Sequence, residues 1–345
     1  MRAAVVREFD APLAIETVPD PACPADGVVL EVGACGVCRS DWHGWRGEHP
    51  RVKPGSIMGH EYCGTVVAAG PGAQFEMGEQ LIAPFILGCG SCAQCRRGVS
   101  NTCLDQIIPG FTDPGAYAQF VAVPRDHNLV RLPETLTPAL AAGLGCRVTT
   151  AWHALTDRAA VEPGDWVAIH GTGGIGQAAA LLAQALGAQV VVVDIVEEKL
   201  DLAKELGADA AINARDGSVA QAIREITGGG AQVSIEALGL VETVNASLEC
   251  LAPLGRHVQI GMPVGHTARM EINMSAVYLG NLALYGTRGM PAWKYPSLLS
   301  LIERGVVDLS PLVAREVGLS DASAELAAMN GPTMPGTAVI TDFMA

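Results

Sequence analysis

Hydrophobic and polar positions follow a different pattern in each of three parts of the chain. Up to about residue 148, short runs rich in valine, such as residues 28–32, 64–67 and 119–123, are separated by glycine and proline. Such runs predict an irregular β domain with tight turns. From residue 149 to 285, short apolar runs alternate with segments of helical periodicity. That alternation predicts βαβ units and a parallel sheet.

The first βαβ unit has the clearest pattern. Residues 166–170 predict a short buried strand, residues 171–176 a turn, and residues 175–186 a helix rich in alanine and leucine that ends at Gly187. The further elements expected in this part are a strand at 189–194, helices at 197–206 and 218–227, and a strand at 232–235.

The last sixty residues lose this alternation. Residues 295–304 predict one amphipathic helix, and residues 336–340 predict a strand that could return to the N-terminal β domain. We therefore expect an α/β chain in which a discontinuous β domain, residues 1–148 and 286–345, is interrupted by a doubly wound parallel domain at residues 149–285.

Composition and charge narrow the range of partners. The chain has 345 residues, of which 49% are hydrophobic and 17% are charged, so it can form a large core. Its 22 Lys and Arg residues against 36 Asp and Glu residues give a net charge of −14, with no basic block to offset it. Nucleic acid and anionic membranes are therefore not expected as partners. No segment has the roughly 20 apolar residues of a membrane span, so we expect a cytoplasmic protein that acts on a small molecule.

Four of the ten cysteines fall within fifteen positions, at Cys89, Cys92, Cys95 and Cys103. The loop that carries them, about residues 88–104, is rich in glycine and can wrap around one ion. Four thiolates form the closed tetrahedral shell of a structural zinc site, which leaves no position for a substrate. An iron–sulfur cluster and a set of reduced thiols are the alternatives.

A glycine-rich turn follows the first strand of the parallel domain. Residues 171–176 spell Gly-Thr-Gly-Gly-Ile-Gly, and Asp194 closes the next strand 18 residues after the last glycine. This is the fingerprint of a dinucleotide site, in which the helix N-terminus faces the pyrophosphate. Asp194 would bind the ribose hydroxyls and repel a 2′-phosphate, which favours NAD over NADP. The alternative is an acid that merely ends a strand. The predicted cofactor contacts of the turn are Gly171, Gly173, Gly174, Ile175 and Gly176.

A second candidate metal site lies in the β domain, where Cys38 and His60 are about twenty residues apart. Either residue alone is more often an ordinary core cysteine or a hydrogen-bonded histidine. Together with the Cys-Arg-Ser-Asp stretch, the Gly-His-Glu stretch, the four-cysteine loop, a Gly-Leu-Gly-Cys stretch at residues 143–146 and the dinucleotide fingerprint, in this order, they carry a resemblance. The chain resembles the zinc-dependent medium-chain alcohol dehydrogenases over essentially its whole length.

The resemblance implies roles for particular residues. Cys38, His60 and Cys146 match the three protein ligands of a catalytic zinc, whose fourth position stays open for water or substrate. Glu61 matches an acid that can approach the metal, and Asp41 matches the carboxylate that orients the ligand histidine.

Further matches concern the proton and the cofactor. Ser40 matches the hydroxyl that contacts the alcohol, and His43 matches the outer end of a relay that passes the proton to solvent. Arg39 resembles a pyrophosphate contact, Thr150 a residue near the nicotinamide, and Lys199 a contact to the adenosine ribose.

The substrate pocket is matched less closely. Phe85 resembles an aromatic wall of the pocket, and Met262 is expected near the nicotinamide or as a core filler. Trp42 and Trp45 flank His43 with unusual bulk, so they either narrow the substrate channel or pack against the β domain, and we assign Trp45 to the pocket. Arg147 departs from the small residue usual in relatives, and it either attracts an acidic substrate or points at solvent or a cofactor phosphate.

The family fold is a GroES-like β domain interrupted by a Rossmann domain, with the active site in the cleft between them. The implied activity is the reversible oxidation of an alcohol to an aldehyde or ketone, with hydride transfer to nicotinamide C4, using NAD and two zinc ions per chain. A homo-oligomer is expected, a tetramer rather than a dimer, through sheet extension near residues 282–285.

Two other functions are compatible with the same fold. One is a zinc-free reductase of the quinone or enoyl type, and the other is a non-catalytic NAD-binding zinc protein. The candidate ligands Cys38, His60 and Cys146 argue against the first, and the complete relay of Ser40 and His43 argues against the second.

Overall fold

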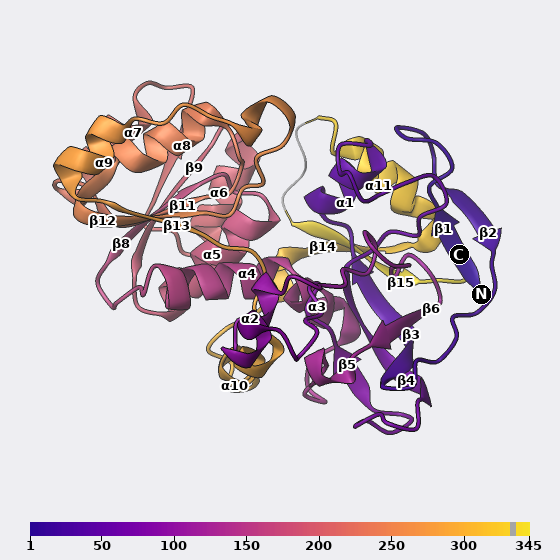
Figure 1. Ribbon diagram of the computed structural model, residues 1–345. Coiled ribbons are helices and arrows are strands. Elements are labelled where there is room, and N and C mark those ends of the chain that lie inside the picture. Colours follow the sequence, from indigo (N-terminus) through magenta and orange to yellow (C-terminus); the bar gives the residue numbers. More distant parts are fainter. Residues whose placement is uncertain (332–335) are drawn as a thin grey trace. The chain divides into compact units, whose positions relative to one another are not determined.

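The computed structural model describes residues 1–331 and 336–345 and divides into two compact units (Figure 1). The first unit comprises Met1–Thr149 and most of the chain from Gly289 onward. The second unit comprises Thr150–Arg288. Each unit has its own large sheet, and the first unit also contains a two-stranded sheet of β1 and β2, so the units are described separately.

The first unit is built on one large, mostly antiparallel sheet. Its main path has the order β14-β15-β3-β4-β5-β7, and β6 also pairs with β3. In the tail strand β15, Val339 lies opposite Gly36 and Ile340 opposite Cys35, so the predicted return of the C-terminal strand is confirmed. The strands of this unit are β1 (Arg2–Val5), β2 (Ala14–Thr17), β3 (Gly27–Gly36), β4 (Glu61–Ala69), β5 (Gln80–Ile82), β6 (Phe120–Pro124), β7 (Val130–Arg131), β14 (Val313–Gly318) and β15 (Thr337–Asp342).

Short helices surround this sheet. Strand β3 is buried along most of its length, with only Glu31 exposed, as expected for a strand with neighbours on both sides. The buried Tyr295 hydroxyl donates to the carbonyl oxygen of Leu144 at 2.9 Å and so fixes the segment that precedes Cys146. The helices of this unit are α1 (Arg39–Trp45), α2 (Ala93–Arg96), α3 (Pro138–Ala142), α10 (Tyr295–Glu303) and α11 (Ala322–Ala328), and the chain enters the second unit within α4 (Arg147–His153).

The second unit contains a six-stranded sheet in the order β10-β9-β8-β11-β12-β13, and every pair is parallel. This is the doubly wound order: from β8 the chain adds β9 and β10 on one side and then β11, β12 and β13 on the other, so the strand order reverses between β8 and β11. Ligands of such sheets bind at the carboxyl ends of the strands at that switch point. The strands are β8 (Trp166–His170), β9 (Gln189–Asp194), β10 (Ala210–Asn213), β11 (Ala231–Glu236), β12 (Leu251–Gln259) and β13 (Ala283–Gly286).

The three helices predicted in the second unit, at 175–186, 197–206 and 218–227, lie within one residue of their predicted bounds, and two further helices were not predicted. Helix α7 shows why: Ser218 accepts a hydrogen bond from the Gln221 N–H at its start, and Gly228 ends it with a φ of +70°. The helices are α5 (Gly174–Ala185), α6 (Glu197–Glu205), α7 (Val219–Thr227), α8 (Val241–Glu249) and α9 (Met274–Gly280), and a π-helical turn covers Ala154–Arg158.

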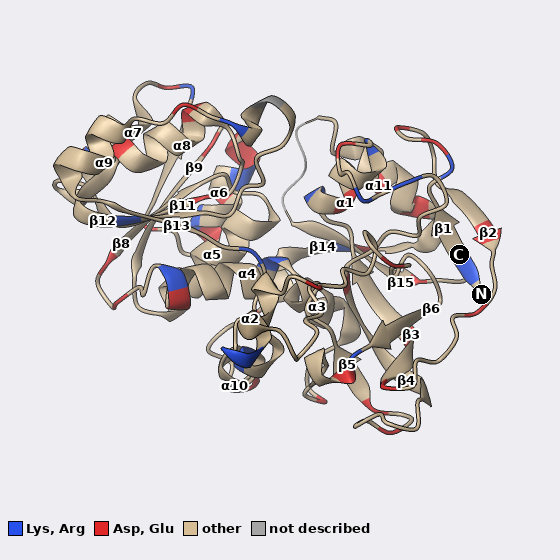
Figure 2. Ribbon diagram, viewed as in Figure 1, with Lys and Arg blue, Asp and Glu red and all other residues tan. Residues whose placement is uncertain are grey.

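The distribution of charge and the length of the helices add two observations. Figure 2 shows Lys and Arg scattered among Asp and Glu in both units. Among the described residues, no segment gathers enough basic residues to offset the net charge of −14. In the part of the chain that the structure describes, no helix is long and apolar enough to cross a membrane.

Candidate active site and metal centres

Three separate segments of the first unit bring four metal-binding groups together. Cys38 precedes α1, His60 and Glu61 lie at the start of β4, and Cys146 precedes α4. One ligand atom from each lies within 4.8 Å of the others. The pairing of β3 with β4, which places Gly36 opposite Glu61, holds the first two segments side by side.

The His60 ring has a fixed orientation. Its Nδ1 lies 2.9 Å from Asp41 Oδ1, and both side chains are buried. The other Asp41 oxygen accepts the Cys38 N–H at 3.1 Å, so the carboxylate also fixes the start of α1. His60 Nε2 is buried and has no hydrogen-bond partner among the described residues. A buried imidazole nitrogen without a hydrogen-bond partner is typical of a metal ligand. Asp41 accepts from Nδ1 and so sets the tautomer in which Nε2 is free to bind a metal.

The two thiols of this cluster have pKa values that are shifted in opposite directions. The Cys146 thiol donates to the Cys38 sulfur, and this bond holds the pKa of Cys38 well below its ordinary range. The same bond raises the pKa of Cys146 well above its ordinary range. Two cysteine sulfurs and one imidazole nitrogen within 4.8 Å of one another are a donor set that zinc accepts.

Glu61 has a buried partner that the sequence did not reveal. Arg147 Nε lies 3.1 Å from Glu61 Oε1, and Arg147 Nη2 bonds Glu61 Oε2. Arg147 Nη1 donates to the Thr337 hydroxyl. Burial raises the pKa of Glu61 to about 7, and the Arg147 charge opposes that rise. A Cβ at Gly36 would lie 2.5 Å from Glu61 Oε2, so glycine leaves the room for this pair.

The contacts of Arg147 correct both interpretations drawn from the sequence. Arg147 is 5% exposed and its guanidinium bonds Glu61 and Thr337, so it points neither at solvent nor toward an acidic substrate or a cofactor phosphate. The pair joins residues 86 positions apart, which no spacing rule could have indicated.

Ser40 and His43 lie on α1, three residues apart, and this spacing puts them on one face of the helix. His43 Nδ1 lies 2.6 Å from Glu48 Oε2, and its side chain is 14% exposed. Glu48 was not among the predicted site residues. A carboxylate at Nδ1 favours the tautomer whose Nε2 can accept a proton.

Two aromatic rings lie near His60. The Phe85 ring is 5.8 Å and the Phe111 ring 5.1 Å from the imidazole, both in edge-on geometry. Phe85 was predicted, whereas Phe111 was missed because it has no motif around it. Trp45, predicted to line the pocket, is instead a core residue: its side chain is 4% exposed, and its Nε1 donates to the Ala11 carbonyl at 2.6 Å.

Trp42 and Arg39 pack against each other. The Arg39 guanidinium lies 3.7 Å from the centre of the Trp42 ring, and the indole Nε1 donates to Asn330 Oδ1 at 2.9 Å. Arg39 also donates to the Met329 carbonyl. The structure therefore shows Arg39, predicted to contact the pyrophosphate, held between an aromatic ring and a carbonyl at an exposed position.

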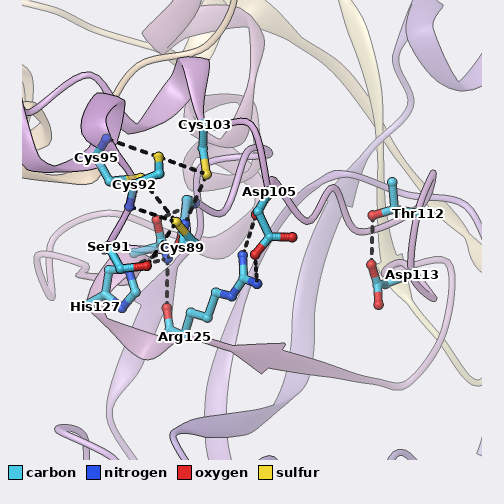
Figure 3. Close-up of polar contacts among 12 residues, drawn as sticks. Cys89, Ser91, Cys92, Cys95, Cys103, Asp105, Thr112, Asp113, Arg125 and His127 are labelled. Carbon is cyan, nitrogen blue, oxygen red and sulfur yellow. Dashed lines mark hydrogen bonds and ion pairs between the residues drawn. The ribbon is translucent and has the colours of Figure 1, made fainter.

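The four-cysteine loop forms the second cluster (Figure 3). Cys89 Sγ and Cys95 Sγ lie 4.0 Å apart, and Cys92 Sγ and Cys103 Sγ lie 3.8 Å apart. Sulfurs about 2.3 Å from one tetrahedral zinc ion lie about 3.8 Å from each other. The Ser91 hydroxyl lowers the pKa of Cys89 to about 5. This geometry fits a single ion rather than a cluster, whose sulfurs bind separate irons.

The glycine turn of the second unit has the shape that a pyrophosphate requires. Gly171 has a φ of +94°. A Cβ at Gly176 would lie 1.8 Å from the Gly171 carbonyl oxygen, so only glycine lets α5 approach β8 this closely. A Cβ at Gly173 would meet nothing within 4 Å, so space is open there. The N-terminus of α5, where Gly174 and Ile175 stand, has no side-chain cap. These features together fit a bound phosphate.

Asp194 is tied to the same turn. Its Oδ2 accepts the Thr172 N–H and the Thr172 hydroxyl, each at 2.8 Å. Its Oδ1 accepts the N–H groups of Ile195 at 2.8 Å and Val196 at 3.1 Å. The Asp194 carboxylate therefore fixes the glycine turn. It is also the residue predicted to bind the ribose.

The remaining residues predicted to contact the cofactor or line the pocket, Thr150, Lys199 and Met262, lie in three separate segments of the second unit. Thr150 is 2% exposed in α4, and Lys199 is 8% exposed in α6. Met262 is 36% exposed and follows the end of β12. Lys199 lies in the first turn of α6, the helix that follows β9 and Asp194.

Comparison with known proteins agrees with both units. A model of the alcohol dehydrogenase GroES-like domain matches residues 24–134, and a model of zinc-binding dehydrogenases matches residues 174–304. An alcohol dehydrogenase of Geobacillus stearothermophilus is 39% identical over 233 residues, 66% of this chain and 68% of that protein. A D-arabinose 1-dehydrogenase (NADP(+)) of Saccharolobus solfataricus is 30% identical over 350 residues, 99% of this chain and 97% of that protein. The solved structure of the alcohol dehydrogenase TADH from Thermus sp. ATN1 has a TM-score of 0.91 at 29% identity and covers 99% of this chain and all 100% of that one.

The fold and the two cysteine-containing clusters thus define a zinc-dependent dehydrogenase with an NAD(P)-binding Rossmann unit. The chain belongs to the zinc-binding medium-chain alcohol dehydrogenase family, as its sequence resemblance implied. It is an NAD(P)-dependent oxidoreductase that acts on an alcohol group.

Breaking the buried Glu61–Arg147 ion pair should lower the stability of the protein strongly. We expect Arg147→Ala to lower the free energy of unfolding by about 3–5 kcal/mol, because it leaves a buried carboxylate unpaired. Urea denaturation followed by circular dichroism measures this change. Arg7→Ala is the matched control, since its ion pair with Glu16 lies at the surface and should contribute far less to the free energy of unfolding. Equal losses for the two variants would contradict the assignment.

Proposed function

We propose that this chain is an NAD-dependent alcohol dehydrogenase, which oxidises an alcohol reversibly to an aldehyde or ketone with hydride transfer to nicotinamide C4. The observation that carries the proposal is the buried, unpartnered Nε2 of His60, oriented by Asp41 and next to the sulfurs of Cys38 and Cys146. A zinc-free reductase has no use for such a cluster.

Cys38, His60 and Cys146 would hold the catalytic zinc, which supplies the Lewis acidity that lowers the pKa of an alcohol. Asp41 keeps the His60 tautomer that presents Nε2. Arg147 pairs with Glu61, the fourth member of the cluster, and fixes the position of this carboxylate beside the proposed ligands. The four-cysteine loop would hold a second, structural zinc ion.

Ser40 and His43 would carry the proton away from the substrate. The Ser40 hydroxyl accepts the alcohol proton and passes its own proton toward His43, on the same face of α1. Glu48, 2.6 Å from His43 Nδ1, keeps the other ring nitrogen available as the acceptor.

The second unit would bind the cofactor, whose nicotinamide ring accepts the hydride. The N-terminus of α5 and the open space at Gly173 suit the pyrophosphate. Asp194 favours NAD because its charge opposes a 2′-phosphate. Arg39, Thr150 and Lys199 are proposed as further cofactor contacts, and Phe85 and Met262 as pocket residues.

The test is NAD reduction, followed by NADH absorbance, with primary, secondary and aromatic alcohols, diols and hydroxy acids. We expect turnover with at least one class, and its loss in Cys38→Ser together with about one zinc ion per chain. Cys23→Ser is the control, because Cys23 is exposed and outside both clusters. Full activity of Cys38→Ser would refute the catalytic role of this site.

Cofactor choice gives a second prediction. We expect Asp194→Gly to reduce kcat/KM with NAD by about tenfold or more and to raise the ratio of NADP to NAD use, since it removes the charge that opposes a 2′-phosphate. Thr172→Val is the control, because it removes one contact to Asp194 and leaves the charge. The same ratio change in Thr172→Val would show that the turn, not the charge, selects the cofactor.

Self-association gives a third prediction. Strand β13 ends the second sheet, and Tyr278, Leu279 and Leu284 near it are 80%, 76% and 40% exposed. We propose a homo-oligomer, a tetramer rather than a dimer, in which two such edges pair. Sedimentation velocity should show a species larger than the 35.8 kDa monomer, and Leu284→Glu should reduce its mass. A monomer at micromolar concentration would exclude this arrangement.

A further inference from the structure

Glu236 is a buried carboxylate at the carboxyl end of β11. Its side chain has no exposed surface. Its oxygens accept the backbone N–H of Leu238 at 2.9 Å, the N–H of Gly239 at 2.9 Å and the Thr243 hydroxyl at 2.6 Å. The Gln259 side-chain amide donates to it from β12. All of these donors are neutral groups.

The same residue also holds the turn that follows β12. Its carbonyl oxygen accepts the N–H groups of Ile260 at 2.9 Å and Gly261 at 2.8 Å. The Gln259 amide that bonds the carboxylate also donates to the Gly261 carbonyl at 2.8 Å. A Cβ at Gly261 would lie 2.2 Å from the Gly239 nitrogen and 2.5 Å from Glu236 Oε2. The turns after β11 and β12 are therefore locked together around one carboxylate.

This pair of turns rests on the glycine turn of the dinucleotide fingerprint. The Ala237 N–H donates to the His170 carbonyl at 3.0 Å. A Cβ at Gly171 would lie 2.6 Å from Leu238 Cγ, so the two turns are in direct contact. A shift of the loop at Leu238 would consequently disturb the surface on which a pyrophosphate lies.

The position of Glu236 in the sheet indicates which half of a dinucleotide it serves. The switch point lies between β8 and β11, and Asp194, at the end of β9, stands on the side proposed for the adenosine ribose. A dinucleotide that crosses the switch point extends its other half over the ends of β11 and β12. Those ends are the two turns that Glu236 holds.

We propose that Glu236 is a positioning residue for the nicotinamide half of the cofactor, acting by fixing the turns after β11 and β12 against the glycine turn. This inference rests on the proposed dinucleotide site. A carboxylate suits the task because it accepts from several N–H groups at once, whereas an amide of the same size would turn an NH₂ group toward those donors.

The test compares the whole cofactor with its adenosine half. In the full-length, zinc-loaded protein, we expect Glu236→Gln to raise the dissociation constant of NADH about tenfold, since charge-assisted hydrogen bonds are lost. The dissociation constant of AMP should change by less than about twofold. NADH fluorescence titration and calorimetry with AMP measure the two values. Glu249→Gln, the same change in α8 away from these turns, should leave both constants unchanged.

Parallel weakening of NADH and AMP would overturn the proposal, because it would indicate a general loss of structure. An unchanged NADH constant in a folded Glu236→Gln protein would also overturn it. If that variant does not fold, Gln259→Met cuts the link to the β12 turn and keeps the carboxylate, and the same preferential loss of NADH is expected. Wild-type protein that binds neither NADH nor AMP would refute the dinucleotide site itself.

Discussion

The hydrogen bond between Asp41 and His60 joins the parts of the first unit that must meet for a metal centre to form. One carboxylate accepts from the His60 ring, from the Gly59 N–H and from the Cys38 N–H, so it links the start of α1 to the start of β4. Because Asp41 is fully buried, these bonds are made in a medium of low dielectric constant, where they are strong and losing one is costly. The orientation of His60 Nε2 toward the two sulfurs follows from this arrangement.

Two solutions to the burial of acidic groups appear in the two units. Near the metal cluster, Glu61 is balanced by the full charge of Arg147, which also bonds Thr337 on β15 and so couples the cluster to the C-terminal strand. In the second unit, Asp194 and Glu236 are balanced by neutral N–H and hydroxyl donors of the adjoining turns. A guanidinium neutralises one buried acid, and its removal leaves an uncompensated charge, whereas hydrogen bonds from backbone amides let an acid fix the loops that carry them. The second solution suits a site that must present several turns to one elongated ligand.

The candidate chemistry depends on both units, and each contributes a different kind of group. The first unit supplies thiols, imidazoles and carboxylates, which hold a metal or move a proton. The second unit supplies glycine turns and a helix N-terminus, which bind phosphate without side chains. The composition of each part reflects this division: the cysteines of both clusters lie before residue 147, and the glycine fingerprint lies after residue 170.

The amino-acid sequence by itself determined the features that depend on local spacing. The four-cysteine loop, the glycine turn with Asp194, the alternation of strands and helices and their ends at Gly187 and Gly228 all follow from neighbouring residues, because turns, caps and chelating loops are built from contiguous chain. Only the tertiary structure revealed the contacts between distant segments. Glu61 meets Arg147 across 86 positions, Trp45 turns into the core, and Glu236 joins the turns of two strands. Such contacts depend on how β3, β4 and the parallel strands pair and pack, and no single stretch of sequence carries that information.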